Sequence, residues 1–366
     1  MTTTNPTSPP PRTLDVGFMP LLDAAPLVAA AQLGLDRKHG FELRLQRQPS
    51  WATLRDRLLS GELDAAHAMA AMVLAVQTGI GGPRADLAIL LGLNRNGQAI
   101  TLSRPLAQAL DRAQERPGTP LADALRALPR RPVFAQTFPT GTHALWLYHW
   151  LAAHGVDPMR DIEAVTLPPP QMPQALADGQ IDGFCAGEPW GGQAEALQAG
   201  RRVVRSGQLW PGHPEKVLAC RRDFAALQPE LATALTAAVL EACRWLDADP
   251  RHRLQAAQWL AAPEAIGLPA ERLAAGLVPP ADEPAREALQ FHADGQANFP
   301  WPSDGRWFLG QFRRWGWLPP GDDGDAWLDD VYRLDTWRDA ARGLGVPLPA
   351  RDARGSLAPL AGDAPA

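Results

Sequence analysis

Short apolar runs alternate with longer amphipathic stretches along the first two thirds of the chain. The runs LDVGFM (14–19) and FELRLQRQ (41–48) have the length and composition of β-strands. The stretches that begin near Asp23 and Trp51 repeat their apolar positions as helices do, and Asp23 is a residue type that favours an N-cap. Strands that alternate with helices predict an α/β fold with parallel strands and crossover connections.

The alternating elements form two sets, which we interpret as two related lobes. The first set ends with a predicted strand over 98–103, and a Pro- and charge-rich interval over 104–131 precedes the second set. From residue 217 onward one strand leads into a predominantly helical tail. The predicted division is a flexible N-terminus over 1–12, lobe 1 over 13–103 plus 217–345, lobe 2 over 104–216, and a flexible C-terminus over 346–366.

One short segment occurs twice in similar form. GELDAAHAMAAM begins at Gly61 and GQIDGFCAGEPW begins at Gly179, so that Asp64 corresponds to Asp182. In both places a helical pattern ends at the glycine and a strand pattern begins at the aspartate. We interpret the pair as the same strand of the two lobes; two unrelated helix-to-strand corners are the alternative.

Two such lobes would enclose a cleft at the carboxyl ends of their strands, where open α/β sheets bind ligands. His143 begins the helix of TGTHALWLYHWLAAHG, and the N–H groups of a helix start favour an anion. A capped helix that merely begins with histidine explains this segment equally well. Lys216 could neutralise one negative charge, although a lone lysine is more often a solvated surface group. The residues expected to line the cleft are Trp51, Gln98, His143, Gly187, Lys216 and Pro169, with His67, Glu188 and Trp190 as neighbours.

Three of these candidates also have structural interpretations. His67 lies in an apolar strand, where a hydrogen-bonded core histidine is more common than a ligand-binding one. Glu188 is the one cleft carboxylate that could do acid–base work, but we expect it to pair with an arginine or a backbone N–H. Trp190 opens a helix at a strand end and could equally be a packing residue.

Composition and motifs exclude several classes of function. The net charge of −5 and the absence of long Lys or Arg runs argue against direct contact with nucleic acid or an anionic membrane. The sequence has no GxxxxGK[ST], HExxH, CxxC or GxSxG motif and no EF-hand loop, so ATP hydrolysis, a metal and hydrolase chemistry are unsupported. We therefore expect a binding protein without a cofactor, not an enzyme.

Five segments together resemble a known family. They are NGQAITLS (96–103), FPTGTHALWLYHWLAAHGVDP (138–158), PPPQM (168–172), DGFCAGEPWGGQ (182–193) and GHPEK (212–216). In this order they resemble the nitrate- and bicarbonate-binding proteins of ABC transporters and a cytoplasmic nitrate/nitrite sensor of an antitermination system. The resemblance covers roughly 13–340 and implies the type II periplasmic-binding-protein fold, with two crossings between lobes near 100 and 217.

The resemblance also implies a ligand and its site. Trp51, Gln98, His143, Gly187 and Lys216 would surround the anion, with Pro169 beside them. Nitrate accepts hydrogen bonds on three oxygens, so a pocket of donors with no acceptor favours nitrate or nitrite over bicarbonate, which also donates.

The role of the protein is a further expectation from this resemblance. Transporter-associated members carry an export signal and a lipid-accepting cysteine, and the start of this sequence shows neither. We therefore expect the cytoplasmic sensor, which holds an RNA-binding antiterminator protein when ligand-free and releases it when nitrate or nitrite binds. The alternative is the solute-binding component of an ABC transporter. An enzyme similar to the pyrimidine-forming synthase of the thiamine pathway has less support, because the clustered cysteines of that enzyme are missing.

Overall fold

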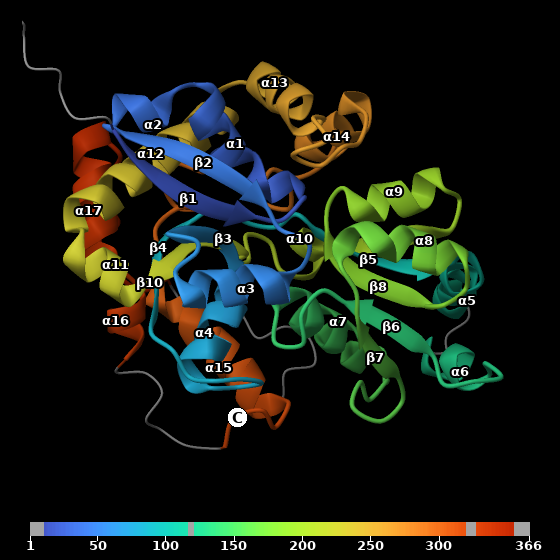
Figure 1. Cartoon of the computed structure of the whole chain (residues 1–366). Coiled ribbons are helices and arrows are strands. Elements are labelled where there is room, and N and C mark those ends of the chain that lie inside the picture. Colours follow the sequence, from blue (N-terminus) through green and yellow to red (C-terminus); the bar gives the residue numbers. More distant parts are fainter. Residues whose placement is uncertain (1–10, 116–120, 320–326, 355–366) are drawn as a thin grey trace, which may run out of the picture.

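Two five-stranded sheets form the cores of two lobes that lie side by side (Figure 1). The computed structural model describes residues 11–115, 121–319 and 327–354. The first sheet has the order β2-β1-β3-β10-β4 and the second the order β7-β6-β8-β5-β9. The strands of the first sheet are β1 (Arg12–Phe18), β2 (Phe41–Arg47), β3 (Ala65–Met69), β4 (Leu87–Gly92) and β10 (Lys216–Arg221). Those of the second are β5 (Gln98–Ser103), β6 (Val133–Gln136), β7 (Glu163–Thr166), β8 (Gly183–Gly187) and β9 (Gly200–Arg205).

The two sheets have the same topology. In each sheet three strands are parallel neighbours, and the strand that enters from the other lobe, β10 or β5, pairs antiparallel on both sides. The chain crosses between β4 and β5 and again before β10, so the predicted two-lobed type II fold with two crossings is confirmed.

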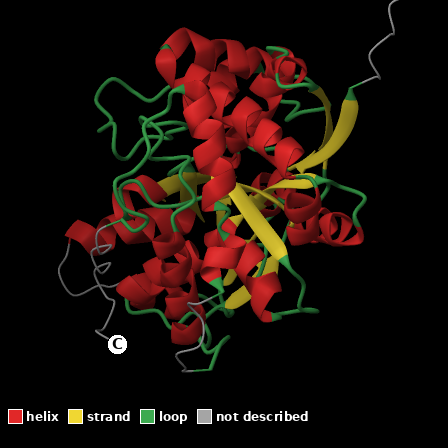
Figure 2. Cartoon of the chain, turned by 90° about the vertical axis from the view of Figure 1, so that its left-hand side faces the viewer, coloured by secondary structure: helices red, strands yellow, loops and turns green. Residues whose placement is uncertain are grey.

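Helices cover both sheets and form the tail (Figure 2). The helices before β10 are η1 (Leu22–Ala24), α1 (Ala25–Gln32), α2 (Leu35–Lys38), α3 (Trp51–Ser60), α4 (Ala70–Thr78), α5 (Arg104–Glu115), α6 (Leu121–Arg126), α7 (Thr142–Ala153), η2 (Pro169–Gln171), α8 (Met172–Ala177), α9 (Trp190–Ala196) and α10 (Ser206–Leu209). The tail contains α11 (Arg222–Leu227), α12 (Pro229–Ala248), α13 (Pro250–Leu260), α14 (Ala270–Leu277), α15 (Pro302–Arg314), α16 (Leu328–Val331) and α17 (Leu334–Leu344).

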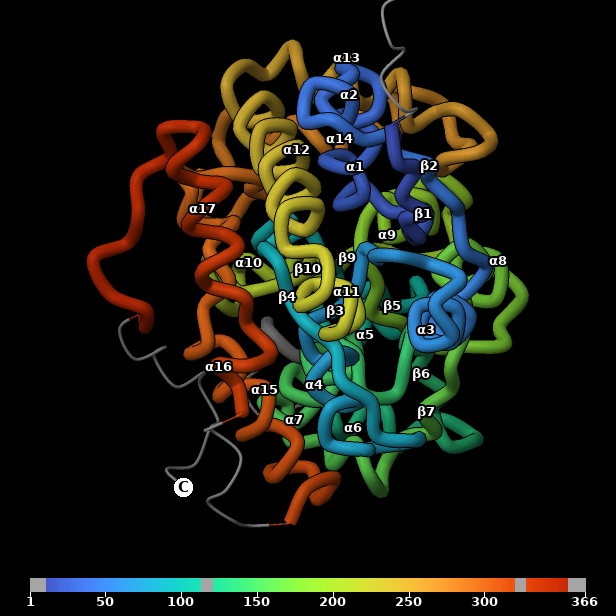
Figure 3. Tube along the Cα trace, turned by 60° about the vertical axis from the view of Figure 1, so that its left-hand side comes forward, coloured from blue at the N-terminus to red at the C-terminus, as the bar shows by residue number. Residues whose placement is uncertain are grey.

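The helical tail packs on both lobes. Helices α12 and α17 lie against each other on the outside of the first lobe (Figure 3). Helix α15 contacts α4 of the first lobe, and its Trp307 also stacks on Trp146 of α7, with ring centroids 5.5 Å apart. No helix in the described parts of the chain is long and apolar enough to cross a bilayer.

The repeated segment has the same structural role in both lobes. Gly61 and Gly179 have φ values of 81° and 68°, a conformation that glycine adopts without steric cost. The carboxylate of Asp64 accepts a hydrogen bond from the backbone N–H of Asp15 at 2.8 Å, and that of Asp182 accepts one from Val133 N–H, also at 2.8 Å. Each aspartate therefore ties the start of β3 or β8 to the neighbouring parallel strand.

Some boundaries differ from those expected. Strand β5 lies in the second sheet, between β8 and β9, so lobe 2 begins before Gln98 and not after residue 103. The interval over 104–131 contains α5 and α6, because regularly spaced apolar residues such as Leu106 and Leu110 are buried on the second lobe.

The ends of the chain also differ from the prediction of flexible termini. Strand β1 already begins at Arg12, whereas residues 1–10 lie outside the described residues. At the other end Val346 is buried, and Arg354 pairs with Asp304 at 2.5 Å. The remaining part of the predicted C-terminus, 355–366, lies outside the described residues.

Candidate functional site

Lys216 and Gln98 occupy matching positions in the two lobes. Lys216 is the first residue of β10 and pairs with Met69, the last residue of β3. Gln98 is the first residue of β5 and pairs with Gly187, the last residue of β8. The two crossing strands therefore present their first side chains at the strand ends where α/β sheets bind ligands.

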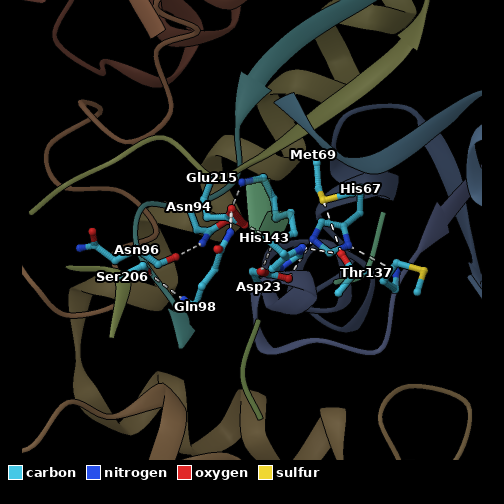
Figure 4. Close-up of polar contacts among 12 residues, drawn as sticks. Asp23, His67, Met69, Asn94, Asn96, Gln98, Thr137, His143, Ser206 and Glu215 are labelled. Carbon is cyan, nitrogen blue, oxygen red and sulfur yellow. Dashed lines mark hydrogen bonds and ion pairs between the residues drawn. The ribbon is translucent and has the colours of Figure 1, made fainter. Parts of the chain in front are cut away.

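Lys216 lies at the centre of this junction and is fully buried. Its Nζ is 3.1 Å from Asp23 Oδ2 and also contacts the carboxylate of Glu215. Figure 4 shows these two acidic residues together with Gln98, His67 and His143. Burial alone would lower the pKa of Lys216, but the two carboxylates outweigh it and raise that pKa. The ammonium also lies 5.7 Å from the centre of the Trp51 ring, which is fully buried too. Lys216 is therefore a buried ammonium that its two carboxylate partners keep in the charged form.

His67 contacts the same ion pair from β3. Its Nδ1 accepts a hydrogen bond from Met19 N–H at 3.3 Å, so the proton of the neutral ring is on Nε2. Nε2 is 2.9 Å from Asp23 Oδ1, although the two atoms are not aligned as a hydrogen bond. Burial lowers the pKa of His67 despite the neighbouring carboxylate. His67 is therefore both buried in the core and part of the site.

His143 reaches the junction from the first turn of α7 in the second lobe. Its Nδ1 lies 2.6 Å from Thr137 Oγ1, and burial holds its pKa well below the usual value. The rings of His143 and Trp51 have centroids 6.3 Å apart. The second ring nitrogen of His143, Nε2, and the indole nitrogen of Trp51, Nε1, are buried and have no hydrogen-bond partner among the described residues. Leaving such groups unpaired costs about 1–3 kcal/mol each. The indole N–H suits a ligand that accepts hydrogen bonds, and His143 Nε2 does so in the tautomer whose Nδ1 accepts from the Thr137 hydroxyl.

Gly187 and Pro169 complete the set expected from the sequence. A Cβ atom at Gly187 would lie 3.4 Å from Asp23 Oδ2 and from the side chain of Leu21, so glycine lets the first lobe approach closely. Pro169 is buried at the start of η2, in the loop after β7. This loop corresponds in the second lobe to the loop after β2 that leads to Trp51.

Glu188 and Trp190 contribute to the contact between the lobes. The carboxylate of Glu188 pairs with Arg202 at 2.9 Å and accepts the N–H of Gly192 at 3.1 Å, as expected for a structural carboxylate. The backbone carbonyl of Glu188 accepts the N–H of Leu22 at 2.8 Å. Trp190 Nε1 donates to the carbonyl of Pro20 at 2.9 Å. These two residues hold the lobes together beside the anion-binding groups.

Two carboxylates of the site were missed from the sequence. Asp23 is not the N-cap of a helix but a buried partner of Lys216. Burial would raise the pKa of Asp23, but Lys216 and His67 outweigh burial and lower that pKa far below its usual range. Glu215 is fully buried, and its carboxylate contacts Lys216 and accepts a hydrogen bond from Gln98 Nε2. The expectation of a pocket without an acceptor is therefore wrong. The only sequence signal for Glu215 was its place beside Lys216 in GHPEK.

The site lacks the composition of a metal centre. Among the residues that the structure describes, no three His, Cys, Asp or Glu side chains are grouped so that they could hold a metal ion. Besides the carboxylates of Asp23 and Glu215, the polar groups that converge there are an ammonium, an indole, an amide and imidazoles. This chemistry is suited to an inorganic anion.

Comparison with known proteins places the chain in a protein family. Residues 7–261 match the NMT1-like family. The chain belongs to that family. The nitrate/nitrite binding protein NrtA of Synechocystis sp. is 35% identical over 95% of this chain and 81% of its own length. The crystal structure of the periplasmic nitrate-binding protein NrtA from Synechocystis PCC 6803 matches with a TM-score of 0.86 and 33% identity, covering 95% of this chain and 94% of that one.

A second kind of relative is a longer protein that contains a segment similar to this chain. The nitrate import ATP-binding protein NrtC of Synechocystis sp. is 36% identical over 91% of this chain, which spans only half of the length of NrtC. These matches confirm the resemblance to the nitrate- and bicarbonate-binding proteins that the sequence motifs indicated. The NrtA relatives are named as binding proteins, which agrees with the expectation of a binding protein for this chain.

Proposed function

We propose that this protein binds nitrate or nitrite between its two lobes. The observation that carries the proposal is the convergence of the buried Lys216 ammonium with two unpaired ring nitrogens, Trp51 Nε1 and His143 Nε2. The indole N–H is a donor, and His143 Nε2 donates in the tautomer whose Nδ1 accepts from the Thr137 hydroxyl. Nitrate is monovalent and planar and accepts hydrogen bonds on three oxygens, so three donors of this kind match it. The names of the NrtA relatives support the same ligand.

We further propose that the protein acts as the solute-binding component of an ABC import system. Both kinds of relative carry nitrate binding or nitrate import in their names, which supports this alternative better than the antitermination sensor that we expected first. The sensor is the second candidate, and only the sequence resemblance and the start of this sequence favour it. Release of an RNA-binding antiterminator and a cytoplasmic location remain predictions from the resemblance.

Calorimetry and thermal unfolding of the ligand-free protein test the ligand. Nitrate at 100 times its Kd should add about 2.7 kcal/mol to the free energy of unfolding. Lys216→Met should remove the response. The chain has one other lysine, Lys38, which is exposed, and Lys38→Met is the matched control that should keep the response. Unchanged stability with both nitrate and nitrite would exclude the proposed function.

A reconstitution experiment separates the two roles. As a transport component, the nitrate-bound protein should stimulate ATP hydrolysis by a nitrate import complex. As a sensor, the ligand-free protein should co-purify with the antiterminator and release it when nitrate is added.

A further inference from the structure

Glu215 holds two of the groups that a bound anion would need. One oxygen of its carboxylate contacts Lys216 Nζ, and the other accepts a hydrogen bond from Gln98 Nε2. The side chain is fully buried, so water cannot replace either contact. Glu215 thus makes to Lys216 the contact that the proposed function assigns to nitrate, and to Gln98 the contact that the family resemblance implies for the anion.

The balance of charges in the site limits how an anion can enter it. Lys216 is the positive group, and Asp23 and Glu215 are its two acidic partners. His67 and His143 are neutral, because burial lowers the pKa of both rings. With Glu215 ionised, nitrate would be the third negative charge around one ammonium. Buried charges without compensation are strongly unfavourable, so the site favours a state with one negative charge fewer.

We propose that Glu215 takes up one proton when the anion binds, so that binding of nitrate or nitrite weakens as the pH rises. This inference rests on the proposed function and deepens it. The proton comes from solvent and forms the O–H bond of a neutral carboxylic acid. The neutral acid leaves the charge of Lys216 to Asp23 and the anion, still accepts from Gln98 and gains one donor of its own.

The surroundings of Glu215 support this assignment of the proton. Burial raises the pKa of Glu215 to about 7, against the opposing effect of Lys216, so protonation near neutral pH requires little free energy. The pKa of His213 is lowered to about 3 by burial, which leaves that ring neutral. Burial raises the pKa of the Cys185 thiol, which therefore carries no charge. The groups that interact with the Glu215 carboxylate are Lys216, Asp23, Gln98, Thr142 and Cys185. The rings of His67, His143 and His213 lie near Lys216, and Arg95 and Asp304, which pair with each other at 3.7 Å, line the same pocket as Glu215.

Titration calorimetry of the full chain with sodium nitrate tests the proposal. At pH 8, the heat measured in Tris and in HEPES should differ by an amount that corresponds to uptake of nearly one proton, and at pH 6 the uptake should be small. Above about pH 7 the Kd should rise by up to tenfold per pH unit, as one linked proton requires. Glu215→Gln should abolish both the uptake and the pH dependence. Glu241→Gln, which alters a carboxylate that pairs with Lys38 at the surface of the first lobe, is the control that should keep both.

Three results would overturn the inference while nitrate binding itself is intact: no proton uptake by the wild type at pH 8, uptake that persists in Glu215→Gln, or an affinity that does not vary with pH. If Glu215→Gln does not fold, the difference infrared spectrum of the wild type decides. A carboxylic acid C=O band should appear when nitrate binds, and an imidazolium band without it would refute the assignment. No nitrate binding at any pH would instead refute the proposed function.

Discussion

Replacement of Lys216 by methionine should destabilise the protein even without a ligand. Asp23 is 2% exposed, and its carboxylate lies 3.1 Å from Lys216 Nζ, so the variant leaves a buried charge without its ammonium partner. Removing one partner of a buried ion pair costs about 3–5 kcal/mol. His67 remains 2.9 Å from Asp23 and compensates in part, so we expect a loss near the lower limit, about 3 kcal/mol. Urea unfolding followed by circular dichroism measures this loss.

A second variant separates the loss of the ion pair from the loss of side-chain packing as causes of the lower stability. Asp23→Asn combined with Lys216→Met removes the ammonium and the carboxylate of Asp23, and it leaves Glu215, whose raised pKa lets it become neutral. The double variant should be at least about 2 kcal/mol more stable than Lys216→Met alone, because replacing both members of a buried pair is often nearly neutral. Lys38→Met should change the unfolding free energy by less than about 1 kcal/mol, since Lys38 is exposed. A loss below about 1 kcal/mol in Lys216→Met, or a double variant no more stable than the single one, would contradict the burial argument.

Three further predictions concern the site and the repeat. Trp51→Phe keeps the aromatic packing but removes the unpaired indole N–H, so calorimetry should show nitrate affinity weaker by about tenfold or more, and an unchanged Kd would remove Trp51 from the site. The folded-state pKa of Glu215 is about 7, above its usual value of 4.5, so the native protein binds more protons than the unfolded protein between these pH values. The contribution of Glu215 to the free energy of unfolding should therefore fall by about 3 kcal/mol from pH 4.5 to 7. A Glu215→Gln variant that shows the same fall in urea titrations would refute this. Asp64→Ala and Asp182→Ala each remove a hydrogen bond between a carboxylate and a backbone N–H. Each variant should lower the unfolding free energy by about 1–3 kcal/mol. Two variants with unchanged unfolding free energy would mean that the repeat does not stabilise the strand starts.

Strand positions could be predicted from the sequence because local periodicity reports which residues are buried. The repeat around Gly61 and Gly179 correctly predicted equivalent strands, since a glycine with positive φ followed by an aspartate and an apolar run is a local signal. The lobe that receives β5 could not be predicted in this way. Its hydrogen-bond partners β8 and β9 lie about 80–100 residues later in the chain, and periodicity contains no information on the partner strand.

The donors of the site were also predictable, whereas its carboxylates were not. The general topology of α/β sheets identifies the strand ends at which ligands bind. Three donor residues lie at the start of an element beside such an end: Lys216, Gln98 and His143. Asp23 has the sequence context of an N-cap, and only its tertiary partners Lys216 and His67 reveal its role. Glu215 next to Lys216 is equally typical of two solvated residues, and burial by both lobes makes them an ion pair in the site.

The formal charges of the site all come from the first lobe or from the segment that leads back into it. Asp23 precedes α1, and Lys216 begins β10, whereas the matching position of the second lobe carries the neutral Gln98. The second lobe adds His143, which is neutral because it is buried. An anion can therefore meet the ammonium and Trp51 on the first lobe before the lobes close. The second lobe would then add uncharged groups, so that a ligand that prefers a closed form would not need opposite charges to face each other between the lobes.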